Sequence, residues 1–430
     1  MTERGDTITP AGSGRKAGDS TATGSGAELQ ASDLVFVDAD GHLLEPPSAL
    51  IEYAPAEYRD TVWQVRVDAD GKEWLILEDM RMEAAVMALA AAGGFDEEMR
   101  VKAHSGELTY TGLPDSCWSA KARLEALDND DIAHSVLYPT MLLTFQSLRS
   151  IEFAEMQCRA YNDWLSDLCA QGEGRLHGVA ILPHLDPERA AAEIRRVAGL
   201  PHIVGVQMRP NPAVEWRHLN HEVYDPIWTA ASEVGLPIGM HPLSSGDLPG
   251  AVQGLRLARL GSSDIPVQDQ EDFGSDNIFF AQALGNPVDM MTSVTFMTAG
   301  GVLTRFPDLR VVFLEANGGW IVPWLERLDH HYEIYSWDVP WLTEPPSAIF
   351  RRQCWISFDC DESTLAFTAR SPLVGADRIV WASDFPHPDA KYPGTTRTLA
   401  ATIAELDPAD QRLIAGQNAA ALYGIDLSST

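Results

Sequence analysis

Two acidic and two histidine side chains in this sequence have the chemistry of a metal site. Asp40 and His42 stand two positions apart in "VDADGHLLEPP", a spacing that places both side chains on the same face of a β-strand. His241 and Asp384 each stand near the end of another apolar run, "LPIGMHP" and "RIVWASDF". Two imidazoles and two carboxylates suit one divalent cation, Zn²⁺ or Mn²⁺. We therefore predict these four residues as metal ligands, provided that the fold brings their strand ends together.

A fold that brings these residues together must have several strands whose carboxyl ends meet at one edge of the sheet. Eight short apolar runs are typical of buried parallel strands, and they cover residues 33–40, 134–140, 176–183, 203–210, 236–242, 309–316, 354–360 and 378–385. Most intervening segments have a helical pattern, as in "DPERAAAEIRRVAG", where Asp186 is the expected N-cap. Alternating strands and helices predict an α/β fold, a (β/α)₈ TIM barrel with its active site at the carboxyl ends of the strands. A doubly wound sheet is the alternative, but no GxGxxG follows the first run.

Two insertions interrupt this alternation. The first, at about 52–120 after the first strand, contains "VWQVRVDADGKEWLILED", whose alternating apolar residues around Asp70-Gly71 predict a β-hairpin. The second, at about 244–290 after the fifth strand, has little periodicity and is predicted to form a loop over the barrel mouth. Residues 1–30 are rich in Gly, Ser, Thr and Ala and are predicted to be a disordered tail, which leaves 31–430 as a single domain.

Composition limits the class of protein. Of the 430 residues, 45% are apolar, which is enough for a large core. The formal net charge of −31 argues against nucleic acid and membrane partners, since contacts to phosphate and anionic lipid need a basic surface. No apolar run is long enough to span a bilayer, residues 1–30 lack the apolar centre of a secretory signal, and the five cysteines form no CxxC pair. We interpret the chain as a cytoplasmic protein with free thiols that acts on a small molecule.

Two other polar residues near predicted strand ends have structural interpretations. Asp38 lies one layer deeper than Asp40 on the same side of the first strand. Burial there is costly for a carboxylate, so we expect Asp38 to be hydrogen-bonded support and not a ligand. His184 follows the third strand directly after Pro183 and is predicted to be a loop residue.

Several segments of the chain resemble those of one known family. They are "VDADGHLLEP", "RLEALDNDDIAHSVLYPT", "GVLTRFPDLRVVFLEANGGWIVPWLERLD", "IVWASDFPH" and "NAAALYG". The chain is similar to the amidohydrolase-related metal-dependent enzymes, in the branch of aminocarboxymuconate semialdehyde decarboxylase and the resorcylate-type decarboxylases. The resemblance covers nearly the whole chain after residue 33. It implies metal ligation by Asp40, His42, His241 and Asp384, the last of which also acts in proton transfer.

The sequence departs from that family at the end of the sixth strand. The well-studied decarboxylases carry a catalytic histidine there, whereas "FLEANGGW" places Glu315 at or next to that position. Glu315 is an additional oxygen ligand, a general acid or base, or a structural carboxylate. Arg209 either holds a substrate carboxylate with its planar guanidinium or forms a salt bridge at the barrel mouth. His387, just beyond the eighth strand, is a further candidate catalytic residue.

These residues are compatible with two reactions. The favoured one is decarboxylation of a small, aromatic or unsaturated carboxylic acid, with Asp384 protonating the carbon that loses CO₂. The alternative is hydrolysis of an amide, ester, lactone or carbon–carbon bond by a metal-activated water, with Glu315 or His387 protonating the leaving group. A non-catalytic barrel without metal is the third possibility, and the retained ligand set argues against it.

One helical segment predicts self-association. The stretch "WIVPWLERLDHHYEIYSW" is amphipathic and unusually aromatic. Relatives in the resembling family are often oligomers. We therefore expect this segment to form a homodimer contact.

Overall fold

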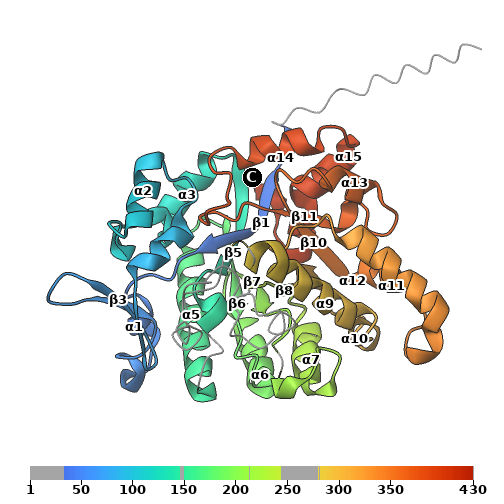
Figure 1. The fold of residues 1–430 in the computed structure, drawn as a ribbon, viewed down its shortest axis with the longest axis horizontal. Helices are drawn as coiled ribbons and strands as arrows, with labels where there is room; N and C mark the ends of the chain where they lie inside the picture. Colours follow the sequence, from blue (N-terminus) through green and yellow to red (C-terminus); the bar gives the residue numbers. More distant parts are fainter. Residues whose placement is uncertain (1–32, 146–149, 213, 244–278, 280, 430) are drawn as a thin grey trace, which may run out of the picture.

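Eight parallel strands form the centre of the molecule. The computed structural model describes residues 33–145, 150–212, 214–243, 279 and 281–429. Each strand is hydrogen-bonded to the next in the series β1 (Phe36–Leu43), β5 (Ile132–Pro139), β6 (Leu176–Ile181), β7 (Ile203–Met208), β8 (Ile238–Met240), β9 (Val311–Phe313), β10 (Cys354–Asp359) and β11 (Ile379–Ala382). Figure 1 shows them surrounded by helices. The predicted TIM barrel is confirmed.

The ring of strands is joined at its mouth by backbone hydrogen bonds between the first strand and the chain after the last. The N–H of Asp384 donates to the carbonyl of Asp40 at 3.0 Å, and the N–H of His42 donates to the carbonyl of Phe385 at 2.9 Å. The buried guanidinium of Arg123 donates to the carbonyls of both Phe385 and His42. Residues with predicted metal-binding roles therefore also hold the barrel together.

Helices follow most strands and cover the outside of the barrel. They are α5 (Ile151–Ala170), α6 (Pro187–Val197), α7 (Asp225–Val234), α9 (Asn286–Thr298), α10 (Val302–Arg305), α11 (Ile321–Tyr335), α12 (Pro346–Gln353), α13 (Leu365–Arg370), α14 (Thr395–Ile403), α15 (Pro408–Arg412) and α16 (Asn418–Tyr423). The predicted N-cap of α6 is confirmed, since the Asp186 side chain accepts from the N–H of Arg189. Among the described residues, no helix combines the length and the hydrophobicity needed to cross a bilayer.

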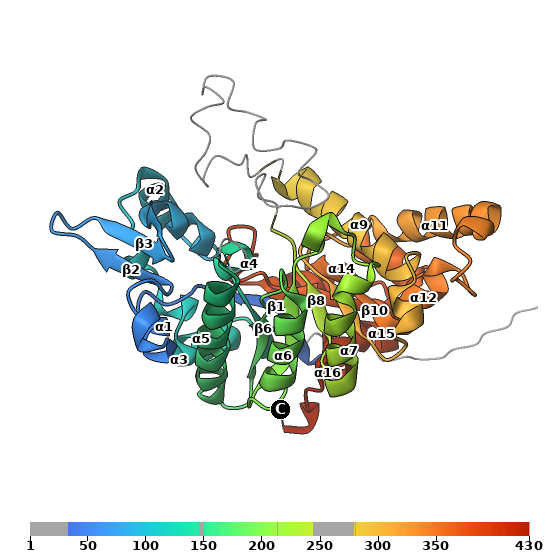
Figure 2. The ribbon, with the colours of Figure 1, turned by 90° about the horizontal axis from the view of Figure 1, so that it is seen from below.

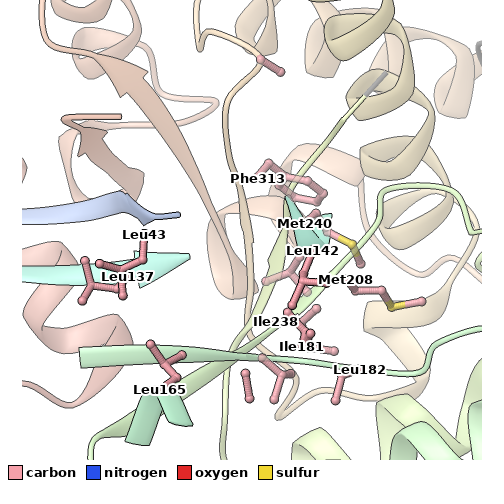
Figure 3. Close-up of a cluster of buried hydrophobic side chains, with 14 of the residues drawn as sticks. Leu43, Leu137, Leu142, Leu165, Ile181, Leu182, Met208, Ile238, Met240 and Phe313 are labelled. Atoms are coloured by element: carbon pink, nitrogen blue, oxygen red, sulfur yellow. The ribbon is translucent and has the colours of Figure 1, made fainter. Parts of the chain in front are cut away.

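Apolar side chains of the strands pack against these helices. Figure 3 shows part of this core, in which Leu137, Ile181 and Met240 come from different strands. Two strands, β8 and β9, are shorter than the sequence pattern suggested: each contains three residues. All five cysteines are buried and free, as predicted.

The first insertion contains the predicted hairpin. Strands β2 (Gln64–Val67) and β3 (Glu73–Leu77) pair antiparallel, and the N–H of Asp68 donates to the carbonyl of Lys72 across the turn at 2.9 Å. Gly71 has a φ of 83°, a conformation that glycine adopts without strain. The pattern did not predict β4 (Met80–Glu83), which adds a third strand. The remaining helices of this region are α1 (Leu50–Tyr53), α2 (Glu97–Ser105) and α3 (Ala120–Asp128).

The end of the second insertion is helical. Residues 244–278 and 280 lie outside the described part of the chain, as does the predicted tail at 1–30. The predicted loop is wrong for residues 281–290, which form the π-helical turn η11 (Ala281–Gly285) and the start of α9. The physical reason is apolar spacing, because Met290, Val294 and Met297 are fully buried on one face of α9.

Helix α11 projects from the barrel on the side opposite the first insertion, as Figures 1 and 2 both show. Its first turns are anchored by the buried Ile321, Val322 and Leu325. Large apolar side chains at and beyond its end are exposed, among them Tyr335, Trp337 and Trp341. The segment predicted to form a dimer contact therefore presents aromatic surface.

A buried histidine pair joins two neighbouring strands of the barrel and predicts a pH dependence of stability. Nδ1 of His134 on β5 and Nε2 of His177 on β6 are 3.1 Å apart and share a hydrogen bond. Burial lowers the pKa of both imidazoles, that of His177 to about 4. The unfolded chain therefore binds more protons than the native state below about pH 6.5, so this contribution to stability is complete above 6.5 and is lost as the pH falls towards 4.

Substituting His177→Asn should keep a hydrogen-bonding side chain and remove one titrating group. We expect the free energy of unfolding to fall less steeply between pH 6.5 and 4, by up to about 1.4 kcal/mol per pH unit. Urea unfolding at several pH values measures this slope. His330→Asn, at an exposed site on α11, is the matched control. An identical slope in His177→Asn and wild type would contradict the prediction.

Candidate active site

The four predicted ligands lie together at the carboxyl ends of the strands. Nε2 of His42 lies 3.2 Å from Nε2 of His241. Oδ1 of Asp40 is 3.5 Å from the former nitrogen and 3.6 Å from the latter. Oδ1 of Asp384 lies 3.3 Å from His42 Nε2. All four residues are buried. Residues more than 300 positions apart in the sequence thus form one compact polar cluster.

This cluster fits a divalent cation. Both carboxylate oxygens of Asp40 are fully buried and have no hydrogen-bond partner among the described residues, a costly arrangement that a bound cation relieves. Nδ1 of His42 lies 2.8 Å from the carbonyl of Pro139, and Nδ1 of His241 lies 2.9 Å from that of Pro242. Each Nδ1 therefore carries the proton and donates, which leaves both Nε2 lone pairs free for a metal.

The electrostatics favour neutral imidazoles at these positions. Burial, followed by the nearby His387 and His241, lowers the pKa of His42 well below its usual value. Burial also lowers the pKa of His241 to about 3. A metal ligand must be the unprotonated imidazole, so both histidines are in the required state at neutral pH.

An irregularity in β1 presents Asp40 and His42 to the site. The register with β5 shifts between Asp38 and Gly41. As predicted, Asp38 stabilises this irregularity of β1 by hydrogen bonds. Its carboxylate accepts from the Ser135 hydroxyl at 2.8 Å and from the N–H and hydroxyl of Ser383 at 2.9 and 2.7 Å. These bonds connect β1 to β5 and to the end of β11.

Gly41 is the residue that allows this close approach. A Cβ at position 41 would lie 2.5 Å from Oδ2 of Asp38 and 2.6 Å from Oγ of Ser135. We expect Gly41→Ala to displace β1, to lower metal content and to cost roughly 1–3 kcal/mol in stability. Gly199→Ala is the control, because its Cβ would meet only the carbonyl of Arg196, at 3.5 Å. Metal analysis and thermal unfolding of both variants test this; equal metal content would contradict it.

Glu315 lies beside the cluster. Its Oε2 is 3.1 Å from Nε2 of His241, and its side chain is 11% exposed. Burial and then the charge of Asp389 raise its pKa. Oxygen and nitrogen atoms of Glu315, His42, Asp384 and His387 lie close enough together to share one ion. The geometry brings Glu315 into the site and leaves all three of its predicted roles open.

The backbone is strained where two of these carboxylates leave their strands. Glu315 and Asp384 have φ values of 43° and 53°, in the left-handed region that residues with a Cβ rarely adopt. Asn317, also near the mouth, has a φ of 53°. This conformation turns the chain sharply at the end of a strand, directly beside the cluster.

His387 contacts the cluster directly. Its Nδ1 is 2.8 Å from Oδ1 of Asp384, and its ring stacks on that of His42 with centroids 4.0 Å apart. Burial, followed by the charges of Asp389 and the neighbouring carboxylates Glu315 and Asp40, raises the pKa of Asp384. Asp384 and His387, each predicted separately as a candidate catalytic residue, are thus in hydrogen-bonding contact.

Arg209 lies at the same end of the barrel, just after β7, and is buried. Burial lowers its pKa to about 10, and the charge of Asp289 partly offsets that effect. The contacts that link the four ligands do not involve Arg209.

His184 follows β6 in a loop, as predicted, but it is fully buried. Burial and then the charge of Arg209 lower the pKa of His184 to about 3.

Three polar residues of the site were not predicted. Glu45 holds the chain after β5, Thr140 contacts His387, and Asp389 affects the pKa of Asp384. Asp389 carried a usable signal, since it stands two positions beyond His387. A cavity of about 450 Å³ opens beside Glu315; the other residues lining it are Phe279, Gln282, Ala283, Ala316, Asn317, Asp359, Pro388 and Asp389.

The chain is similar to known proteins over most of its length. A family model described as amidohydrolase matches residues 37–425. A 2-amino-3-carboxymuconate-6-semialdehyde decarboxylase of Dictyostelium discoideum is 24% identical over 324 residues, 74% of this chain and 80% of the relative. An amidohydrolase structure from Mycobacterium avium subsp. paratuberculosis is 21% identical with a TM-score of 0.69 and covers 91% of this chain and 100% of its own. A 5-carboxyvanillate decarboxylase of Novosphingobium aromaticivorans, complexed with manganese, is 18% identical with a TM-score of 0.58 and covers 91% and 96%.

Proposed function

The chain belongs to the amidohydrolase family, and from that premise we propose that it is a metal-dependent decarboxylase of a small, aromatic or unsaturated carboxylic acid. The observation that carries the proposal is the convergence of Asp40, His42, His241 and Asp384 at the barrel mouth. The name of the Dictyostelium relative supports decarboxylation over hydrolysis.

In this proposal the four converging side chains hold one Mn²⁺ or Zn²⁺. When bound, the ion supplies positive charge that draws substrate oxygens into place and stabilises the negative charge that develops during the reaction. The manganese-bound structural relative supports Mn²⁺. The two neutral imidazoles and two carboxylates give a mixed ligand set that also suits Zn²⁺.

The protein's own residues would supply the proton and the orientation. The carbon–carbon bond to the substrate carboxylate breaks, CO₂ leaves, and the electron pair stays on the carbon. Asp384 takes up a proton from solvent and donates it to that carbon, a role supported by its position in the cluster and by its hydrogen-bonding contact with His387. Arg209 holds an anionic or oxygen-bearing part of the substrate by its planar guanidinium.

Hydrolysis is the second candidate, favoured by one observation. Glu315 is a carboxylate beside His241. It stands at or next to the position where the resembling decarboxylases have a catalytic histidine. In this alternative Asp384 accepts a proton from the attacking water. Glu315 or His387 then protonates the leaving group.

Isotope incorporation separates the two reactions. Purified protein loaded with Mn²⁺ or Zn²⁺ would be assayed on a panel of hydroxybenzoic acids and unsaturated dicarboxylic acids, and on amides, esters and lactones of the same acids. Decarboxylation releases CO₂ and, in D₂O, places one deuterium on the carbon that lost it. Hydrolysis in H₂¹⁸O instead places ¹⁸O in a product without CO₂ release. The second result would overturn the proposed decarboxylase.

We also propose that the protein is a homodimer that associates through the end of α11, in the cytoplasm. Support comes from the exposed Trp337 and Trp341 on this projecting segment, and from five buried free thiols. Light scattering during size-exclusion chromatography should give the mass of two chains, and Trp337→Ser should give one. Trp216→Ser, which removes a similarly exposed tryptophan elsewhere, should leave the dimer intact. A monomeric wild type at micromolar concentration would refute this assembly.

A further inference from the structure

A chain of hydrogen bonds connects the end of β5 to Asp384, and we propose that Thr140 is a positioning residue that fixes His387 and, through it, Asp384. Oγ1 of Thr140 lies 3.1 Å from Nε2 of His387. Nδ1 of the same imidazole lies 2.8 Å from Oδ1 of Asp384. All three residues are more than nine-tenths buried. The inference rests on the proposed metal site and is independent of the reaction catalysed there.

The chemistry of the three groups sets the direction of both hydrogen bonds. Asp384 is ionised while it binds the metal and before it takes up the proton used in the reaction, and a carboxylate only accepts hydrogen bonds. Nδ1 of His387 must therefore carry the imidazole proton, which leaves Nε2 as an acceptor. The Thr140 hydroxyl is the group that donates to this nitrogen. It holds His387 in one tautomer and one ring orientation.

Thr140 is itself held rigidly. The carboxylate of Glu45, which is fully buried, accepts from the backbone N–H groups of residues 140–142 at 3.0 to 3.2 Å. The preceding residue, Pro139, accepts from Nδ1 of His42 at 2.8 Å. Two consecutive residues at one strand end thus hold two different imidazoles. Glu45 anchors the segment that carries both contacts.

Loss of the Thr140 hydroxyl should weaken metal binding in two ways. A freed His387 ring withdraws the hydrogen bond that orients Asp384. The same ring stacks on His42 with centroids 4.0 Å apart and an interplanar angle of 29°, so its movement also disturbs that ligand. Partners that orient a metal ligand typically contribute 10–100-fold to affinity.

Binding of Mn²⁺, measured by titration calorimetry on the full chain, tests this proposal. We expect Thr140→Val, which keeps the shape and removes the hydroxyl, to weaken binding by roughly 10–100-fold. Thr140→Ser, which keeps the hydroxyl, should restore wild-type affinity. In a His387→Gln background, Thr140→Val should have little further effect. Thr402→Val on α14, where the hydroxyl donates to the carbonyl of Cys360, is the control for loss of a threonine hydroxyl elsewhere.

A second measurement reads His387 directly. In protein labelled with ¹⁵N-histidine and loaded with diamagnetic Zn²⁺, the ring nitrogens of His387, assigned by comparison with His387→Gln, should report a proton on Nδ1. In Thr140→Val this signal should shift or broaden towards mixed tautomers. Unchanged signals together with unchanged Mn²⁺ affinity in Thr140→Val would overturn the proposal, as would an equal loss in Thr140→Ser. A wild type that binds neither Mn²⁺ nor Zn²⁺ would instead overturn the proposed function. The role of Thr140 would then be decided by whether Thr140→Val shifts or broadens the His387 signals of the metal-free protein, and unchanged signals would overturn it.

Discussion

Replacing His241 with alanine should remove the bound ion and, with it, all measurable turnover. The His241 side chain is fully buried, and its Nε2 faces His42, Asp40 and Glu315 within 3.6 Å. Alanine supplies no ligand, and the remaining carboxylates then repel one another without the imidazole between them. We expect metal affinity to fall by more than about 100-fold, since loss of a mere indirect partner of a ligand already costs roughly 10–100-fold.

Plasma mass spectrometry of purified protein measures this result. Wild type loaded with Mn²⁺ should hold about one ion per chain, whereas His241→Ala should hold almost none. His330→Ala, at an exposed position on α11, is the matched control for loss of an imidazole. Circular dichroism must show that His241→Ala is folded. A folded variant that keeps its ion would contradict the predicted ligand set.

Replacing Asp384 with asparagine should separate metal binding from proton transfer. Asparagine keeps an oxygen that can accept from His387 and contact a metal, but it has no proton to donate to carbon. It also tolerates the φ of 53° at this position better than most residues do. We therefore expect a folded variant with weakened but measurable metal binding, and a kcat lower by about 10²–10⁴-fold at saturating metal.

The measurement compares kcat with metal occupancy in the same samples. Asp338→Asn, on the exposed segment after α11, is the control for the loss of one carboxylate. Activity that returns fully when Asp384→Asn is saturated with Mn²⁺ would contradict the proton-transfer role. In that case Asp384 would act only as a ligand.

The barrel and the convergence of the four proposed ligands were predictable because both depend on local patterns. Buried parallel strands appear as short apolar runs, and the TIM-barrel rule then places the residues after them at one mouth. His42, His241 and Asp384 each sit at such a position, so their convergence followed from the predicted fold. The helix at 286–298 was missed because its apolar positions, Met290 and Val294 among them, are diluted by threonine and serine.

The contacts that hold the site residues in place could not be predicted from the sequence pattern. Glu45 bonds to the backbone of residues about 95 positions away, and backbone N–H groups have no sequence signature. The register shift beside Gly41 depends on how β1 lies against β5. Thr140 resembles any threonine at a strand end until the His387 ring is placed against it. Such contacts are products of tertiary packing, which single-sequence patterns do not encode.

The left-handed backbone at Glu315 and Asp384 implies a trade-off between durability and catalysis. A residue with a Cβ in this region costs roughly 1–2 kcal/mol relative to glycine, which has no such penalty. Glycine at position 315 would relax the backbone but delete a carboxylate that contacts His241. A sequence optimised only for a higher melting temperature would therefore be expected to replace Glu315 and lose its contact with His241. Position 315 is therefore one at which a substitution that stabilises the fold should cost activity.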